Sequence, residues 1–328
     1  MLNAHPRATR RSTLLLLAGL LAAGAAAAQD KPFPSRPITI VIPTAPGGNL
    51  DLLARVVAEK LQQSWGQQVV VESRAGANTT LATTYVAKAP ADGHTALFTI
   101  SGFVQNLVLQ SNPAYKASDL APVSLVASFP IAMAANVAVP ASTLADVVKL
   151  AKEKPGTLSF GSYGLGSGAH VIGAGLNKAA GIDITHVPYK GEAASFPDLA
   201  SGRIPFAYGS VGFYGRQLSE GKVKLIVVAS PSRLKEYPDV PTFAEAGYPD
   251  INLAGWGALF LPAGTPPALV DKWSKEVQRI TTMPDVQKKI ADMGFLPVGN
   301  SSAEFARVIE SDLQRWGAVV KANNIKLD

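Results

Sequence analysis

The chain of 328 residues contains no cysteine. This absence excludes disulfide bonds, thiolate metal sites and cysteine nucleophiles. Histidine is also scarce, with four in the whole chain, and those at positions 94, 170 and 186 do not have the spacing of metal ligands. After the first thirty residues, no apolar run reaches the length of a transmembrane helix. We therefore expect neither a metal site nor a membrane span in the body of the protein.

The first 28 residues have the composition of a secretory leader. Three arginines within the first eleven positions precede an apolar run over 14–23, and Ala26-Ala27-Ala28 precedes Gln29. This order predicts that residues 1–28 are a signal peptide and that the protein is periplasmic. The pair of arginines at 10–11 leaves both the general secretory route and the twin-arginine route open. Removing the leader lowers the formal net charge from +6 to about +3, which gives no support to nucleic-acid binding.

The rest of the sequence alternates apolar runs with segments of helical spacing. The runs "ITIVIP" at 38–43, "QVVVES" at 68–73 and "TALFTIS" at 95–101 are typical of buried strands. Helical segments separate these runs, and the first of them should stop at Gly66. The alternation predicts an α/β fold with parallel sheets that helices cover. The same pattern restarts with expected strands at 158–160, 184–188, 204–210 and 223–230.

Two longer apolar stretches, 127–139 and 253–264, are candidates for strands that cross from one lobe to another. A mature chain of about 300 residues favours two lobes, because single cores stop growing near that size. We therefore expect a discontinuous first lobe, 33–127 plus 256–328, and a second lobe, 128–255. Two crossing strands would form a hinge with a cleft between the lobes, where small ligands commonly bind.

Four expected strand-to-helix turns are similar in composition, at 43–49, 74–80, 161–168 and 188–192. Ligands of parallel sheets bind at the carboxyl ends of strands, where helix N-termini direct unpaired N–H groups at the site. Glycine in such turns allows the backbone to approach a ligand closely. The four turns together indicate a site that grips a carboxylate with backbone amides. Any one of them alone is more typical of ordinary loop packing.

Two other functions were weighed for the turn at 161–168. Gly164-x-Gly166-x-x-Ala169 fits a dinucleotide fingerprint, but Asp183 stands before its strand and not after it, so no nucleotide cofactor is expected. A serine hydrolase would use Ser162 or Ser167 with His170 or His186. However, the turn lacks the Gly-x-Ser-x-Gly elbow, and no acidic partner is evident.

The sequence resembles one family along its whole mature length. The resemblance is carried in order by "FPSRPITIVIPTAPGGNLDLLARVVAEKL", "QQVVVESRAGAN", "APADGHTALF", "SYGLGSGAH", "PYKGEAASFPDLASGRI", "LIVVASPSRLKEYPDVPTFAEAGYP" and "WGALFLPAGTPPALV". These segments are similar to the substrate-binding proteins of tripartite tricarboxylate transporters, the Bug-type periplasmic receptors. The resemblance implies a Venus-flytrap fold, two parallel-sheet-based domains joined by two crossing strands. It also implies capture of a small organic acid for a membrane permease.

The resemblance also implies the ligand contacts, carried over position by position. In the first lobe they are Ala45, Pro46, Gly47, Gly48, Gly76, Ala77, Asn78, Thr79 and Thr80. In the second lobe they are Ser162, Tyr163, Gly166, Ser167, Gly168, His170, Pro188, Tyr189, Lys190 and Gly191. The candidates for recognising the rest of the ligand are Thr79, Thr80, Phe103, Asn106, Tyr163, Tyr189 and Phe213.

The sequence departs from the family pattern at two places. Where the family usually continues with glycines, this chain reads Asn78 to Thr84, whose polar groups either bind the ligand or, at Thr83 and Thr84, face solvent. Where the family often has an acidic residue after the strand at 204–210, this chain reads Tyr208-Gly209-Ser210. The missing carboxylate favours a simple or aromatic carboxylate over an amino acid.

The sequence thus predicts a monomeric periplasmic receptor without catalysis. It would capture a small carboxylate, either a di- or tricarboxylate or an aromatic acid, and deliver it to a tripartite permease. Two alternatives stay open: an exported serine hydrolase that uses Ser167 and His170, and a receptor that feeds a membrane sensor.

Overall fold

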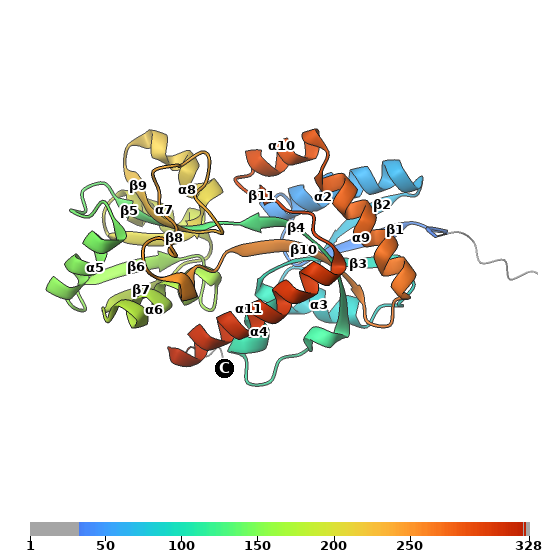
Figure 1. The fold of residues 1–328 in the computed structure, drawn as a ribbon, viewed down its shortest axis with the longest axis horizontal. Helices are drawn as coiled ribbons and strands as arrows, with labels where there is room; N and C mark the ends of the chain where they lie inside the picture. Colours follow the sequence, from blue (N-terminus) through green and yellow to red (C-terminus); the bar gives the residue numbers. More distant parts are fainter. Residues whose placement is uncertain (1–32, 324, 326–328) are drawn as a thin grey trace, which may run out of the picture. The chain divides into compact units, whose positions relative to one another are not determined.

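The strands form two separate sheets, and helices cover both of them (Figure 1). The computed structural model describes residues 33–323 and residue 325. The expected signal peptide, residues 1–28, lies outside the described residues. Residues 37–328 cluster into a single unit that contains both sheets. Within the described residues, none of the helices combines the length and the apolar character needed to cross a membrane.

The first sheet has six strands in the order β11-β4-β10-β3-β1-β2. β1 pairs in parallel with β2 and β3, whereas β10 runs antiparallel to β3 and β4, and β11 runs antiparallel to β4. The strands are β1 (Ile38–Ile42), β2 (Val69–Ser73), β3 (Thr95–Ile100), β4 (Leu120–Phe129), β10 (Gly255–Pro262) and β11 (Leu296–Pro297). The helices of this part are α2 (Asn49–Trp65), α3 (Thr80–Ala87), α4 (Gly102–Leu109), η1 (Ala117–Asp119), α9 (Pro267–Thr281), α10 (Pro284–Asp292) and α11 (Ser302–Ala322).

The second sheet has five strands in the order β7-β6-β8-β5-β9. β6 pairs in parallel with β7 and β8, whereas β5 runs antiparallel to β8 and β9. The strands are β5 (Ile131–Asn136), β6 (Leu158–Ser162), β7 (Ile184–Pro188), β8 (Phe206–Ser210) and β9 (Val223–Ala229). The helices of this part are α5 (Leu144–Glu153), α6 (Gly168–Ala180), α7 (Glu192–Ala200), α8 (Val211–Gln217), η2 (Leu218–Glu220) and η3 (Pro249–Ile251).

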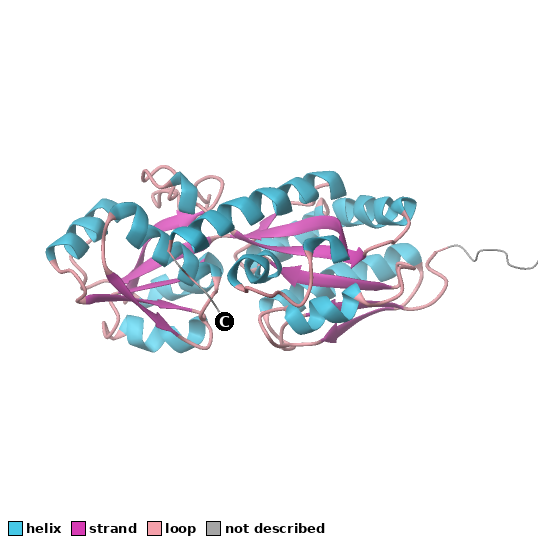
Figure 2. Cartoon of the chain, turned by 90° about the horizontal axis from the view of Figure 1, so that it is seen from below, coloured by secondary structure: helices cyan, strands magenta, loops and turns pink. Residues whose placement is uncertain are grey.

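The predicted α/β class with two sheet-based lobes is confirmed, and the sheets are mixed rather than parallel throughout. Each sheet keeps a parallel core of three strands, β2-β1-β3 in the first and β7-β6-β8 in the second. The antiparallel pairs involve the strands next to the crossings, β4, β5 and β10, together with β9 and β11. Figure 2 shows the same two groups of strands from a second direction.

The chain passes from the first sheet to the second at Pro130, which separates β4 from β5. The stretch expected to cross as one run over 127–139 is therefore two strands. Proline has no N–H to donate to a sheet ladder, but the carbonyl of Pro130 accepts a hydrogen bond of 3.0 Å from the Val211 N–H at the start of α8. The chain returns to the first sheet just before β10, which begins at Gly255.

Most helix boundaries follow local rules that the sequence displays. α2 ends where Gly66 adopts φ +67°, as expected for a left-handed C-cap. α5 begins with a capping box in which Thr143 and Asp146 satisfy each other's backbone N–H groups. Two helices that the spacing did not predict, α4 and α8, begin immediately after β3 and β8, with only Ser101 or no residue between.

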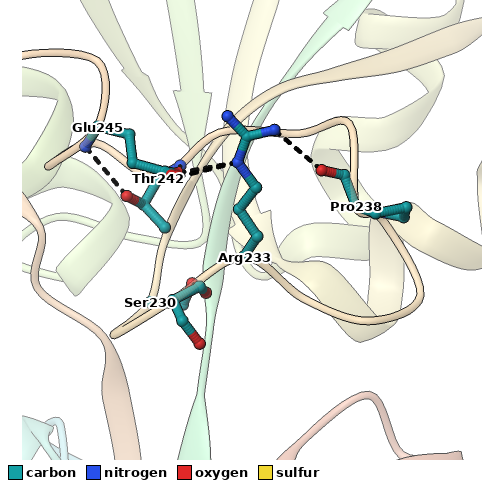
Figure 3. Close-up of polar contacts among 6 residues, drawn as sticks. Ser230, Arg233, Pro238, Thr242 and Glu245 are labelled. Atoms are coloured by element: carbon teal, nitrogen blue, oxygen red, sulfur yellow. Dashed lines mark hydrogen bonds and ion pairs between the residues drawn. The ribbon is translucent and has the colours of Figure 1, made fainter.

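The segment from Ser230 to Tyr248 has little regular structure and is held by side chains (Figure 3). The Arg233 guanidinium donates through Nε to both carboxylate oxygens of Glu245, at 3.0 and 3.1 Å, and through Nη1 to the Pro238 carbonyl at 3.0 Å. Glu245 also accepts from the Thr242 N–H at 2.8 Å, and its own N–H donates to Thr242 Oγ1 at 3.1 Å. The Nε–H is shared between the two carboxylate oxygens, and the guanidinium joins Glu245 to Pro238, so one arginine connects two parts of the loop.

Helix α11 packs against α4 and β4 from the first sheet region and against α6 and η3 from the second. The Trp256 indole N–H in β10 donates a hydrogen bond of 2.7 Å to Asp312 Oδ2 in α11. Burial raises the pKa of the Asp312 carboxyl to about 6, although the Trp256 hydrogen bond opposes the shift. Trp256 therefore ties the crossing strand to α11.

Substituting Asp312 with Asn should stabilise the protein at neutral pH. A carboxyl whose folded pKa is raised favours the protonated form, so the fold loses stability as pH rises from about 4 through about 6. Asparagine keeps an acceptor for Trp256 and carries no buried charge. We expect Asp312→Asn to raise the melting temperature at pH 7.5 by a few degrees. The gain should vanish at pH 4, and a lower melting temperature at pH 7.5 would contradict this account.

Candidate functional site

A cavity of about 220 Å³ lies between the two sheets, where strands of both end. Its walls include the last residues of β3, β4 and β8, the first residues of β5 and β10, and the starts of α2 and α7. This is the position at which α/β sheets bind ligands. The lining residues are Thr44, Asn49, Leu50, Ile100, Ser101, Phe129, Ile131, Tyr163, Glu192, Ser210, Gly255 and Phe295.

The turn between β1 and α2 contributes through the residues at its two ends. Thr44 and Asn49 line the cavity, whereas the predicted contacts between them, Ala45, Pro46, Gly47 and Gly48, are exposed to solvent. The Gly47 N–H is already used, because it donates to Asp51 Oδ2 at 2.9 Å. The Thr44 hydroxyl oxygen is buried and has no hydrogen-bond partner among the described residues.

The turn between β2 and α3 is held internally by one buried amide. Gly76 and Thr80 flank three residues with positive φ, namely Ala77 (47°), Asn78 (43°) and Thr79 (78°). Asn106, which is fully buried, donates to the Asn78 carbonyl and accepts from Asn78 Nδ2 at 2.9 Å. The expectation that Asn106 is available to a ligand is therefore wrong, because its amide stabilises a strained turn.

Other side chains expected to recognise the ligand are also buried, packed or hydrogen-bonded within the fold. Phe103 is fully buried and stacks on Tyr115 at a centroid distance of 5.3 Å. Phe213 packs edge-on to Phe196 in the second sheet region. Thr83 does not face solvent, because it is fully buried, and Thr84 donates its hydroxyl to the Thr80 carbonyl at 2.7 Å. These side chains support the fold rather than line the cavity.

The glycine-rich turn between β6 and α6 is closed by its own serines. Ser167 is the N-cap of α6, because its hydroxyl accepts from the His170 N–H at 3.3 Å and donates to the Gly164 carbonyl at 2.6 Å. The Gly166 N–H donates to His170 Nδ1 at 3.1 Å. Ser162, fully buried, lies 2.7 Å from His186 Nε2.

This geometry gives Ser167 and His170 the roles of cap and packing residue, not of nucleophile and base. The His170 ring nitrogen nearest the turn accepts from a backbone N–H, and the His170 ring stacks on the His186 ring at 3.9 Å between centroids. Burial lowers the pKa of both imidazoles, that of His186 to about 4, with His170 as the second cause. Among the described residues, no group of three or more His, Asp or Glu side chains could hold a metal ion.

Tyr163 belongs to this turn and connects it with the cavity. Its ring lines the cavity, and its hydroxyl is 3.1 Å from the position that a Cβ on Gly168 would take. The Ala169 N–H at the start of α6 donates to this hydroxyl. Burial, followed by the nearby Glu192 carboxylate, raises the pKa of Tyr163, so the phenol stays protonated. Tyr163 is the predicted second-lobe contact that lines the cavity.

The predicted contacts in the turn between β7 and α7 do not line the cavity. Pro188 and Lys190 are exposed, and Gly191 has φ +103°. The Tyr189 hydroxyl donates to Asp198 Oδ2 at 2.8 Å, and this hydrogen bond holds the Tyr189 side chain against α7. The cavity residue from this turn is Glu192, the first residue of α7.

Tyr163 is the cavity residue among the predicted contacts, and the missed residues include a hydrogen-bonded pair, Glu192 and Ser210. The Ser210 N–H donates to Glu192 Oε1 at 2.5 Å, and the Ser210 hydroxyl donates to Oε2 at 2.8 Å. A Cβ on Gly209 would lie 2.7 Å from Tyr214 Cε2 and 3.1 Å from Glu192 Cγ, so these two side chains share the space beside β8 that Gly209 leaves empty. The inference that this region lacks a carboxylate is therefore wrong.

The two α/β sheets, the crossing strands and the cavity between them define a protein of the periplasmic-binding-protein class. Residues 53–325 match the family model described as the tripartite tricarboxylate transporter family receptor. The chain belongs to this family.

Similar proteins include a sequence relative and two solved structures. The chain is 32% identical to the protein BugT of Bordetella pertussis over 298 residues, which cover 90% of this chain and 91% of BugT. A structure from R. palustris with adipate is 31% identical, with a TM-score of 0.78 and coverage of 90% of this chain and 99% of that one. MatC from Rhodopseudomonas palustris with bound malate is 32% identical, with a TM-score of 0.74 and coverage of 88% and 100%.

Proposed function

We propose that this protein is a periplasmic receptor that captures a small organic carboxylate in the cavity between its two sheets and delivers it to the membrane components of a tripartite transporter. The observation that carries the proposal is the cavity itself. Residues from both sheets line it, at strand ends and helix starts. A ligand there would contact both lobes and favour the arrangement in which they are close, in proportion to its differential affinity.

The first-lobe wall offers groups suited to an oxyanion. α2 is 17 residues long and begins after Gly48, which provides no side-chain cap, so its first N–H groups remain available. Thr44 adds a buried hydroxyl without a partner among the described residues. Helix N-termini favour negative charge without a cationic side chain. The range of ligands consistent with this wall includes di- and tricarboxylates and aromatic acids.

A receptor role fits the side chains better than hydrolysis does. Ser167 is used as a helix cap and Ser162 is fully buried, whereas a nucleophile must reach its substrate. A receptor that feeds a sensor would need the same cavity, so neighbouring genes for permease components would favour transport. Family members with adipate and malate are consistent with a carboxylate as the ligand.

Organic acids should raise the melting temperature of the purified mature protein. Binding to the folded state alone stabilises it by mass action, by about 2.7 kcal/mol when the ligand stands at 100 times its dissociation constant. We expect a rise of several degrees with at least one acid in a panel of mono-, di-, tri- and aromatic carboxylates, measured by thermal shift. Neutral sugars of similar size are the control. A shift with sugars and none with any acid would refute the proposed function.

A further inference from the structure

The cavity wall contains a buried carboxyl group that a carboxylate ligand has to accommodate. Glu192 is the carboxylate among its lining residues, and no Lys, Arg or His of the described residues lines it. Arg216 and Tyr214 lie close enough to Glu192 for electrostatic interaction with its side chain. Tyr163 is also part of the cavity wall. A ligand bound here therefore meets an acidic group on the second-lobe side.

The Glu192 side chain is held in place on two sides. Ser210 donates to each carboxylate oxygen, and the Cγ atom occupies part of the space beside Gly209. Each carboxylate oxygen can accept two hydrogen bonds, so these contacts leave acceptor capacity on both oxygens at the cavity wall. Burial raises the pKa of Glu192, and the Ser210 hydrogen bonds oppose that shift. The carboxyl group is thus fixed, partly desolvated and incompletely satisfied.

We propose that Glu192, oriented by Ser210, selects for ligands that carry a hydrogen-bond donor, a hydroxyl or an ammonium group, on the same skeleton as the carboxylate. The proposal rests on the proposed carboxylate-binding function and narrows its substrate class. The ligand carboxylate would lie toward Thr44 and the start of α2, and the donor would lie toward Glu192. The two ends of the ligand are then recognised by opposite walls of one cavity.

The alternative ligands are disfavoured by the same carboxyl group. An unsubstituted diacid would place a second carboxylate opposite Glu192, and two adjacent carboxylates bind only if one of them takes up a proton. An apolar tail would leave the Glu192 acceptors without a partner after water is displaced. A hydroxyl or ammonium group satisfies those acceptors, and the ammonium also compensates the charge.

The experiment compares acids that share a skeleton and differ in the donor. Isothermal titration calorimetry at pH 7.5 would use three sets: succinate, malate and aspartate; glutarate, hydroxyglutarate and glutamate; and phenylacetate, mandelate and phenylglycine. In the set that binds best, we expect a donor-bearing acid to bind at least about tenfold more tightly than the unsubstituted acid. Comparison of the hydroxyl and amino members then distinguishes the two kinds of donor.

The same titrations with Glu192→Gln test the residue. This variant removes the charge and keeps one acceptor for Ser210, and we expect the preference to fall toward unity, chiefly because the unsubstituted acid binds more tightly. Glu220→Gln is the matched control, because Glu220 is exposed and pairs with Lys222 at 3.6 Å. It should leave the preference unchanged.

Each outcome bears on the proposal. Equal binding of substituted and unsubstituted acids by the wild-type protein overturns it, whether or not Glu192→Gln folds. A preference that survives in a folded Glu192→Gln protein also overturns it. If none of the acids binds, the proposed function fails and this inference fails with it, whereas acids that bind without the preference refute this inference alone.

Discussion

Replacing Gly212 with alanine should weaken ligand binding by roughly one to two orders of magnitude. Gly212 in α8 lies against the segment that connects α10 to β11, so the contact joins the second sheet region to the first. A Cβ on Gly212 would be 2.3 Å from the Met293 carbonyl oxygen, and a Cβ on Gly294 would be 2.1 Å from the Gly212 Cα. Both neighbours are backbone, so the clash is relieved only if the two regions move apart.

The consequence for binding follows from the cavity walls. Tyr163, Glu192 and Ser210 come from the second sheet region, and Thr44 and Asn49 come from the first. In a variant that favours separated sheet regions, part of the ligand-binding free energy is used to bring these walls together. The apparent affinity then falls in proportion to the population of the close arrangement.

Calorimetry with the acid that gives the largest thermal shift would measure the loss, and small-angle scattering would report the separation. Gly317→Ala in α11 is the matched control. A Cβ there would meet Val108 at an ordinary 3.6 Å, and alanine favours a helix. Unchanged affinity in Gly212→Ala would show that the glycine contact does not govern closure.

Acid should destabilise the protein through the stacked imidazoles, His170 and His186. The folded pKa of His186 is lowered from 6.5 to about 4, first by burial and then by the adjacent His170. An unfolded chain binds the proton at a higher pH than the folded chain does, so stability rises with pH across this window. The contribution is complete above pH 6.5 and is lost as pH falls from about 6.5 through about 4.

Replacing His186 with Gln should flatten this dependence. Glutamine keeps a polar group near Ser162 but does not titrate. Between pH 7.5 and pH 4.5, we expect the melting temperature of the wild-type protein to fall by a few degrees more than that of His186→Gln. Parallel curves for the two proteins would contradict the role of the pair.

The sequence predicted the fold well wherever a local signal marks a boundary. Gly66 ends α2, and the four turns at 43–49, 74–80, 161–168 and 188–192 each join a strand to a helix. The helices α4 and α8 escaped prediction because neither is preceded by a loop of turn-forming residues. The break at Pro130 escaped it because the residues on both sides are apolar and each belongs to a different sheet.

The site was less predictable than the fold, because its contacts depend on packing between distant segments. The glycines of the turns indicated helix N-termini correctly, but they did not indicate which turn residues reach the cavity. Glu192 meets Ser210 across 18 positions, through the packing of α7 on β8. Asn106 looked suited to a ligand because no local pattern revealed its bonds to Asn78, 28 positions away.

The packing of α11 on both sheet regions also bears on how the lobes could move. α11 contacts α6 and η3 as well as α4 and β4, and Arg315 Nη2 donates to the Asn252 carbonyl at 3.0 Å just before the return crossing. An arrangement with two crossing strands and a helix beside them restricts rotation more than two strands alone do. Relative rotation that preserves the α11 contacts has its axis near this helix, so displacement increases with distance from it. Contacts far from α11 would therefore separate more on opening than contacts close to it.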